Sequence, residues 1–418
     1  MLPSSTSAAR KWIGRGTALT VVIAIGLLSA SCAEQPRTLR VWSDVPQMAI
    51  VAELYNRTQQ DVRIELSNYE KPYAAHLDGL DAPDIIISRD LGGARLADHF
   101  VSLESLVSDG DARFYPGLLA LGVHDEDQLL IPLSFDAPGI MFPRDAAPRS
   151  VDPFAIGDED LQTYAAVFNE SSGDRFRAMG FLPRLDPRFI LAQARHNGVA
   201  LRGEDTLRWD PVGLRTSMVT IGDWIDRING SVASEDEYKQ RYLHDPVKRL
   251  MEDGRILFAF TTVSEFFTGD DRSWLEFRWY MNDHRIHLWG APVMAGVTVE
   301  SSIRQGAISF LRELTSPGPQ ESVMGESERM SGTGFGFLGG LSSLPEINRG
   351  ALVDSYRDLE GMIPSSTRWS FGPRLPRDWN SLRDEAVLPV MRRYYVENID
   401  LEETLQSEVE RWFRQQTD

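Results

Sequence analysis

The sequence predicts an α/β protein built from two domains. Strand-like and helix-like segments alternate between residues 39 and 88, and this order predicts a sheet with helices packed on it. A strand-like segment at 132–142 carries prolines at 132 and 138, which predicts a crossing of the chain between the two domains. The length agrees, because roughly 385 residues follow the leader described below and single domains usually hold about 100–200 residues.

The first domain begins with elements that differ in their hydrophobic pattern. Residues 39–42 alternate apolar and polar side chains, and Ser43-Asp44 then offers a helix N-cap. The run at 84–88 is nearly all apolar, as expected of a strand buried on both faces of a parallel sheet. The elements that we expect here are strands at 39–42, 62–66 and 84–88 and an amphipathic helix at 48–58.

The second half is predicted to be richer in helices. Pro211 suits the first turn of a helix whose apolar stripe contains Trp224, so we assign that tryptophan to the core. The expected helices lie at 176–179, 189–196, 211–228 and 306–314, and the expected strands lie within 254–262 and at 286–292. We expect crossings between the domains at 134–137, 290–295 and 335–340, the last in a flexible glycine-rich run.

Residues 1–31 are predicted to be the signal peptide of a lipoprotein. A basic start is followed by an apolar run at 17–30 that is too short to cross about 30 Å of hydrocarbon. Cys32, the only cysteine in the sequence, follows directly, and Leu28-Ser29-Ala30-Ser31-Cys32 resembles a bacterial lipobox. We therefore expect Cys32 to be the lipid anchor and 32–38 to be a tether. The alternative is an ordinary signal peptide and a buried free thiol.

The net charge of the chain argues against nucleic acid and anionic lipid as partners. The formal net charge is −18, and it becomes −21 without the leader because the leader holds three basic residues and no acidic one. Nucleic-acid binding needs a basic surface, so we expect no nucleic-acid partner. We also expect no adhesion to anionic lipid beyond the anchor.

Several motifs, in their order along the chain, resemble the family 1 extracellular solute-binding proteins, the sugar-type receptors of ABC importers. They are Leu39–Asp44, Ala82–Ile86, Ile131–Leu133 with Ile140–Phe142, Glu252–Arg255, Ala307–Gln320 and Ile399–Leu405. At the second half of the crossing the family usually has Tyr-Asn, where this chain has Phe142-Pro143. The resemblance covers nearly the whole chain after the leader.

This resemblance implies a two-lobed, periplasmic-binding-protein-like fold, with several hinge crossings and a central cleft that closes over a solute. It implies an ABC permease as partner, an extracytoplasmic location, a monomer, no cofactor and no catalysis. We place the N-terminal lobe at 39–134 plus 295–336 and the C-terminal lobe at 138–290 plus 341–418.

Candidate binding residues follow from where ligands meet α/β lobes, at the carboxyl ends of strands. They share polar or aromatic side chains just after an expected strand or on the first crossing. They are Trp42, Ser43, Asp44, Tyr69, Glu70, Tyr73, Arg89, Asp90, Phe135, Asp136, Thr262, Ser264 and Glu265. Aromatic faces with carboxylate acceptors suit a carbohydrate, and they would also suit a cationic solute such as a polyamine.

The sequence also contains features that other functions would use. Gly334–Gly339 fits G-x-G-x-x-G, but no long helix pattern follows it, so nucleotide binding is disfavoured. His284 and His287, after Asp283, offer too few ligands for structural zinc, and we predict no metal site. An exported glycoside hydrolase is the enzyme alternative. A lipid-anchored sensor or adhesin without transport is the non-enzymatic one.

Overall fold

The computed structural model describes residues 36–79, 81–93, 95–107, 111–146, 152–203, 206–330, 334–397 and 399–416. The predicted signal peptide and Cys32 lie outside these residues. Within them, no helix combines the length and the apolar character that a membrane span requires.

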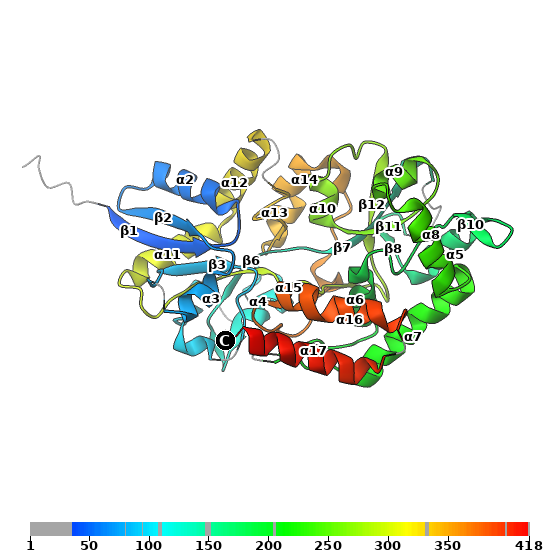
Figure 1. Cartoon of the computed structure of the whole chain (residues 1–418). Coiled ribbons are helices and arrows are strands. Elements are labelled where there is room, and N and C mark those ends of the chain that lie inside the picture. Colours follow the sequence, from blue (N-terminus) through cyan, green and yellow to red (C-terminus); the bar gives the residue numbers. More distant parts are fainter. Residues whose placement is uncertain are drawn as a thin grey trace, which may run out of the picture.

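The first sheet has six strands and lies at one end of the molecule (Figure 1). Strand β1 pairs in parallel with β2 and β3, whereas β14, β6 and β15 add antiparallel pairs. In spatial order the strands are β15 (Leu341–Ser342), β6 (Ile131–Phe135), β14 (Val293–Val297), β3 (Ile85–Ser88), β1 (Arg37–Ser43) and β2 (Val62–Asn68). Its helices are α2 (Met48–Thr58), α3 (Pro72–Leu77), α4 (Pro116–Leu119), α11 (Arg304–Leu314), α12 (Pro317–Arg329), α13 (Pro345–Arg349) and α14 (Ala351–Ser355).

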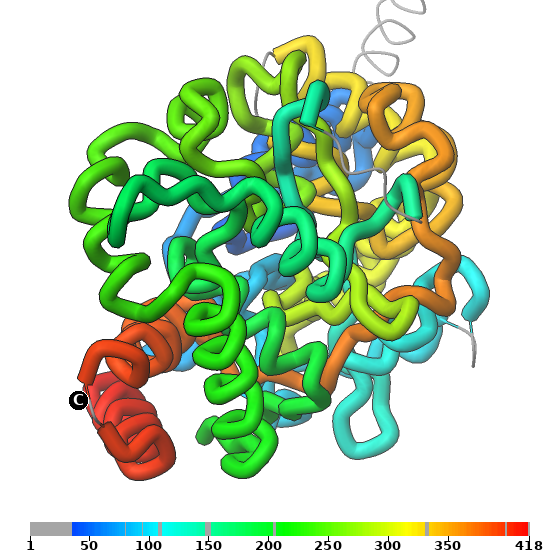
Figure 2. The backbone as a smooth tube through the Cα atoms, turned by 90° about the vertical axis from the view of Figure 1, so that its right-hand side faces the viewer, coloured from blue at the N-terminus to red at the C-terminus, as the bar shows by residue number. Residues whose placement is uncertain are grey.

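The second sheet has four strands and lies at the other end (Figure 1). Its order is β11 (Ala259–Thr262), β7 (Pro138–Pro143), β12 (Leu275–Tyr280) and β8 (Ala155–Ile156). Around it lie α5 (Asp158–Phe168), α6 (Pro187–His196), α7 (Pro211–Ile228), α8 (Val232–Tyr242), α9 (Val247–Glu252) and α10 (Val263–Thr268). The chain ends with α15 (Trp379–Leu382), η7 (Arg383–Val387), α16 (Leu388–Tyr394) and α17 (Leu401–Gln415), and α17 lies at the periphery in Figure 2.

Three further pairs of short strands lie outside the two large sheets. The first two are antiparallel and the third is parallel. They are β4 (Val123–His124) with β5 (Asp127–Gln128), β9 (Glu170–Ser172) with β10 (Arg175–Ala178), and β13 (Ile286–His287) with β16 (Trp369–Ser370). The last pair lies in the segments that connect the two sheets.

Most of the expected elements are confirmed, with four differences. Residues 176–179 are not helical, because most of them belong to β10, a strand of the β9–β10 hairpin. The strand expected at 286–292 ends at His287, and residues 293–297 form the separate strand β14. Strand β1 begins at Arg37, two residues earlier than expected, and pairs there with Val62 of β2, while residues 32–35 of the expected tether lie outside the described residues.

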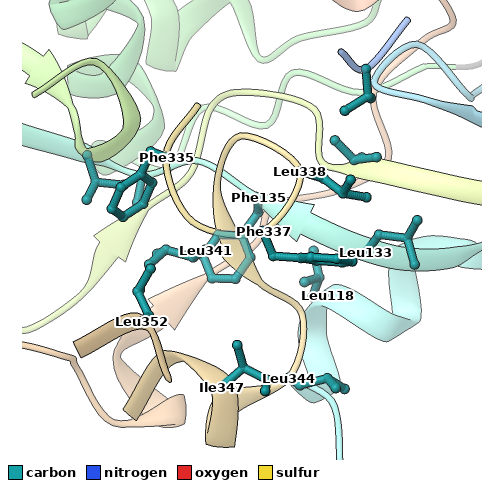
Figure 3. Close-up of a cluster of buried hydrophobic side chains, with 14 of the residues drawn as sticks. Leu118, Leu133, Phe135, Phe335, Phe337, Leu338, Leu341, Leu344, Ile347 and Leu352 are labelled. Carbon is teal, nitrogen blue, oxygen red and sulfur yellow. The ribbon is translucent and has the colours of Figure 1, made fainter. Parts of the chain in front are cut away.

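The fourth difference concerns the glycine-rich segment at 335–340, which is not a crossing between the sheets. It leads from α12 to β15, and β15 pairs with β6 of the first sheet. Phe335, Phe337 and Leu338 are fully buried in the cluster shown in Figure 3. Residues 341–342 therefore lie in the first sheet, whereas our lobe boundaries assigned them to the C-terminal lobe; the division as a whole stays a prediction.

Two large apolar clusters form the core. One extends from the first sheet across the crossing to one face of the second sheet, and the other lies between the second sheet and helices α6, α7, α16 and α17. Trp224 is buried in the latter, as expected. The crossing from β6 to β7 is only Asp136-Ala137, so the two sheets are held close together at this point.

Candidate functional site

The carboxyl end of β1 presents an aromatic pair next to a carboxylate. The rings of Trp42 and Tyr69 lie 4.4 Å apart at 38°, and Trp42 is 5% exposed. Between Trp42 and Asp44, Ser43 is fully buried and donates its hydroxyl to the Ile87 carbonyl at 2.7 Å. Ser43 thus ties β1 to β3, and this contact fixes the position of the Asp44 backbone.

Asp44 has an oxygen that lacks a donor. Its Oδ1 atom is buried and has no hydrogen-bond partner among the described residues. The Arg89 backbone N–H reaches Oδ2 at 3.5 Å. Burial raises the pKa of Asp44, while the charge of Arg89 and a hydrogen bond from Ser88 oppose that rise. A partly buried carboxylate with an unused acceptor is a place where a ligand hydroxyl or ammonium group can donate.

The carboxyl end of β3 joins this site to the second half of the molecule. Arg89 donates from Nη2 to the Leu338 carbonyl at 3.3 Å, and Asp90 Oδ1 accepts from Asn380 Nδ2 at 3.2 Å. Burial raises the pKa of Asp90 to about 6, and the charges of Asp378 and Asp44 add to the effect. Because Asn380 belongs to α15, this hydrogen bond spans the boundary between the end of β3 and the C-terminal helices.

Arginine, lysine and tryptophan side chains extend the contacts between the two halves of the molecule. Arg383 Nη1 donates to Asn380 Oδ1 at 2.9 Å, and the Arg383 guanidinium lies 5.1 Å from the centroid of a Trp289 ring. The guanidinium of Arg188, at the start of α6, lies 6.0 Å from a Trp289 ring centroid. A second link between the two halves is Lys71, whose Nζ lies 5.8 Å from a Trp412 ring centroid in α17.

The candidates at the start of α10 are bound mainly to one another. Asp136 accepts from the Ser264 backbone N–H at 3.2 Å and from its hydroxyl at 2.5 Å, and burial raises the pKa of Asp136. Thr262 and Glu265 form a reciprocal capping box, with bonds of 3.4 and 3.3 Å. These groups hold the crossing against α10, so their geometry has an evident structural purpose.

Arg188 connects this second group to the first. Its Nη1 atom lies 2.5 Å from Glu265 Oε1, and the same guanidinium faces Trp289. A continuous series of contacts therefore runs from Glu265 of α10 through Arg188, Trp289 and Arg383 to the end of β3.

Two aromatic candidates lie apart from these groups. Phe135 is 3% exposed and packs on Tyr115, Trp369 and Phe371. Tyr73 is buried against Phe100 and His76 beneath the first sheet. Glu70, in contrast, is exposed. Whether these residues bind a ligand remains a prediction.

Sequence reasoning missed the contributions of α15 and α6. Asn380 and Arg383 are three positions apart, which places them on one face of a helical turn, and this spacing is the signal that could have indicated them. His284 and His287 gain no metal partners, since the described residues contain no group of three or more potential metal ligands.

The fold is that of known two-lobed binding proteins. No family model and no curated protein sequence matches this chain. The sugar-binding protein MalE from Xanthomonas citri superposes with a TM-score of 0.64 at 13% identity, over 91% of this chain and 97% of that one. A family 1 extracellular solute-binding protein from Alicyclobacillus acidocaldarius gives 0.62 at 11% identity, over 92% and 100%.

A third solved structure, the GacH receptor of Streptomyces glaucescens, gives 0.57 at 14% identity, over 92% of this chain and 100% of that one. At these identities the comparison shows the fold, and it does so over nearly the full length of both chains. The predicted two-lobed α/β fold is therefore confirmed.

Proposed function

We propose that this protein is an extracytoplasmic receptor that captures a small solute, of the carbohydrate class, and delivers it to an ABC-type importer. Support comes first from the fold neighbours, which are binding proteins rather than enzymes. They include a MalE sugar-binding protein, the GacH receptor in complex with acarbose and a protein with mannobiose bound. Solute capture without catalysis is therefore the function that this fold favours.

The observation that carries the proposal is the unpartnered Oδ1 of Asp44, two residues after Trp42 of the Trp42–Tyr69 pair. A sugar ring has apolar C–H faces that pack on aromatic rings and hydroxyls that donate to carboxylates. Asp90, Asn380 and Arg383 supply further donors and acceptors from both sides of the boundary. Sites of this kind hold ligands by a few directed polar groups on otherwise apolar walls.

A polyamine is the second candidate solute, because Asp44, Asp90 and Asp378 place three carboxylates near one another. Arg89 and Arg383 lie among them and would repel a polycation. A thermal-shift screen with acarbose, mannobiose, lacto-N-biose and spermidine distinguishes the two classes, since a bound ligand stabilises the native state. Sugar affinity should change little with salt, whereas spermidine affinity should fall steeply.

Asp44→Ala is expected to weaken binding of the solute found in that screen at least tenfold, because a hydrogen bond to a charged group contributes about 1.5–3 kcal/mol. Isothermal titration calorimetry of both proteins measures the loss. Asp354→Ala, at a side chain that is 70% exposed, should leave affinity unchanged. Equal affinity of wild type and Asp44→Ala would remove Asp44 from the site. Absence of any sugar binding would refute the carbohydrate class.

We also propose that Cys32 carries a lipid anchor that holds the receptor at the outer face of a membrane, where a permease can receive the solute. The support is the position of Cys32 directly after the apolar run of the leader. Cys32→Ser is expected to move the protein from the membrane fraction to the soluble exported fraction, measured by fractionation and immunoblotting. A variant that stays in the membrane fraction as firmly as wild type would contradict the anchor. A sensor or adhesin would keep the anchor and the solute site but would need no permease.

A further inference from the structure

A pocket that shares Arg89 and Trp289 with the candidate site is lined by segments from both ends of the molecule. Its walls come from the loop after β3, from α4 and the turn that follows, from α6, and from the connecting segments 288–292 and 371–376. The space within the pocket and at its mouth, which includes open solvent, is about 820 Å³. The apolar side chains on its walls are Leu91, Leu118, Leu121, Leu201, Leu288, Trp289, Met294, Phe371 and Leu375, with several prolines.

Arg195 of α6 lines this pocket and has no acidic partner among the described residues. The residue is only 8% exposed. Its guanidinium donates from Nε to the Leu288 carbonyl at 3.4 Å and from Nη1 to the Val199 carbonyl at 2.8 Å. Nη2 makes no hydrogen bond with the described part of the chain. Burial is the only cause acting on the pKa of Arg195, and it lowers that pKa.

An arginine in this state is unusual because a buried charge is costly unless an opposite charge compensates it. Two backbone carbonyls supply dipoles and no charge. The described lining residues include Arg89, His124, Arg195 and Arg374 but no Asp or Glu, in a chain with 61 acidic residues. Among its described lining residues, the pocket thus contains arginine side chains and no carboxylate.

The other basic groups of the wall are already engaged. The charge of Arg89 acts on the Asp44 carboxylate, and Arg374 donates from Nη1 to His124 Nδ1 at 2.6 Å. Burial and the Arg374 charge lower the pKa of His124 to about 4, so His124 is neutral near pH 7 and accepts this hydrogen bond. Arg195 is therefore a basic group of the wall whose printed hydrogen bonds go only to two backbone carbonyls.

The backbone around Arg195 leaves room for its guanidinium. Gly372 has a φ of +23°, and a Cβ there would lie 2.1 Å from Arg195 Nη2. At Gly290, in contrast to Gly372, a Cβ would meet no atom within 4 Å. The pocket is therefore tight where the guanidinium lies and open at Gly290.

We propose that this pocket binds a small monoanion in which a carboxylate is attached to an apolar body. The carboxylate would accept from Arg195, since guanidinium groups match carboxylates in geometry and charge. The apolar body would pack on the leucine, proline and phenylalanine walls. Most of the lining around Arg195 is apolar, so a monoanion with an apolar body fits better than a fully polar dianion such as phosphate.

Benzoate is the probe, and benzyl alcohol is its neutral counterpart of similar shape. Isothermal titration calorimetry at pH 7.5 should show saturable benzoate binding at least tenfold tighter than that of benzyl alcohol or of inorganic phosphate. Equal binding of benzoate and benzyl alcohol, or binding of phosphate alone, would overturn the proposal, and so would the absence of benzoate binding.

Two variants locate the binding. Arg195→Met removes the charge and keeps an apolar stem, and it should reduce benzoate affinity at least tenfold. Gly290→Leu fills the open part of the pocket and should reduce affinity to a similar degree with Arg195 intact. Gly318→Leu, at another glycine where a Cβ meets nothing within 4 Å, is the matched control and should bind benzoate as wild type does. Unchanged affinity in folded Gly290→Leu would place benzoate elsewhere and refute the site, even if Arg195→Met failed to fold.

Discussion

Replacing Phe337 with alanine is expected to lower the free energy of unfolding by about 3–5 kcal/mol. The ring is fully buried in the cluster that Figure 3 shows, together with Phe135, Leu341 and Ile347. Its removal loses the transfer free energy of the ring and leaves a cavity, which the surrounding sheet and helices fill only in part. Urea denaturation followed by circular dichroism measures the change.

Val396→Ala is the control for this experiment. Val396 is 64% exposed, so its truncation should change stability by less than about 0.5 kcal/mol. A loss below about 1 kcal/mol in Phe337→Ala would contradict the buried position of the 335–340 segment, and it would favour the flexible crossing that the glycines suggest.

Asp90→Asn is expected to stabilise the protein above pH 6 and to have little effect near pH 4. The pKa of Asp90 is about 6 in the folded protein, compared with 3.8 ordinarily. A group whose pKa is raised on folding contributes stability that is fully present below the unfolded pKa and is lost as pH rises through the folded pKa. Above pH 6 the ionised carboxylate therefore costs up to about 3 kcal/mol, and the variant avoids that cost.

The substitution preserves shape, because an asparagine Oδ1 can still accept from Asn380 Nδ2. Urea denaturation at pH 4.0 and pH 7.5 should show a difference between variant and wild type only at the higher pH, of about 1–3 kcal/mol. Asp354→Asn, at an exposed carboxylate, should show no such pH-dependent gain. An equal effect of Asp90→Asn at both pH values would mean that Asp90 titrates normally.

Local patterns were sufficient to predict elements whose surroundings are uniform along their length. The apolar run of β3 is buried at all four positions, and α7 begins at Pro211 and buries its predicted stripe. Residues 176–179 were misassigned because four residues cover little more than one helical turn and cannot define a period. The segment at 335–340 was misjudged because its glycines indicate a turn, whereas its burial depends on β6 and α14, which are distant in sequence or follow later.

The same distinction applies to the candidate site. Asp44, Arg89 and Asp90 follow directly after strands, and the rule that ligands meet strand ends was enough to select them. Asn380 and Arg383 reach these residues only because α15 packs against the end of β3, and no local pattern encodes that contact. Thr262 and Glu265 show the converse, since a capping box and a ligand-binding loop use the same residue types.

The position of β14 has a consequence for how the chain acquires its structure during synthesis. This strand lies between β3 and β6, with Ala295 opposite Ile87, so the first sheet needs residues from 37 to 342. The second sheet uses only residues 138–280. Pairings between distant residues form slowly because loop closure costs entropy before the contacts stabilise it. The sheet that is encoded first is therefore completed last. The nascent chain carries an unfinished sheet edge until just over four-fifths of it has been made.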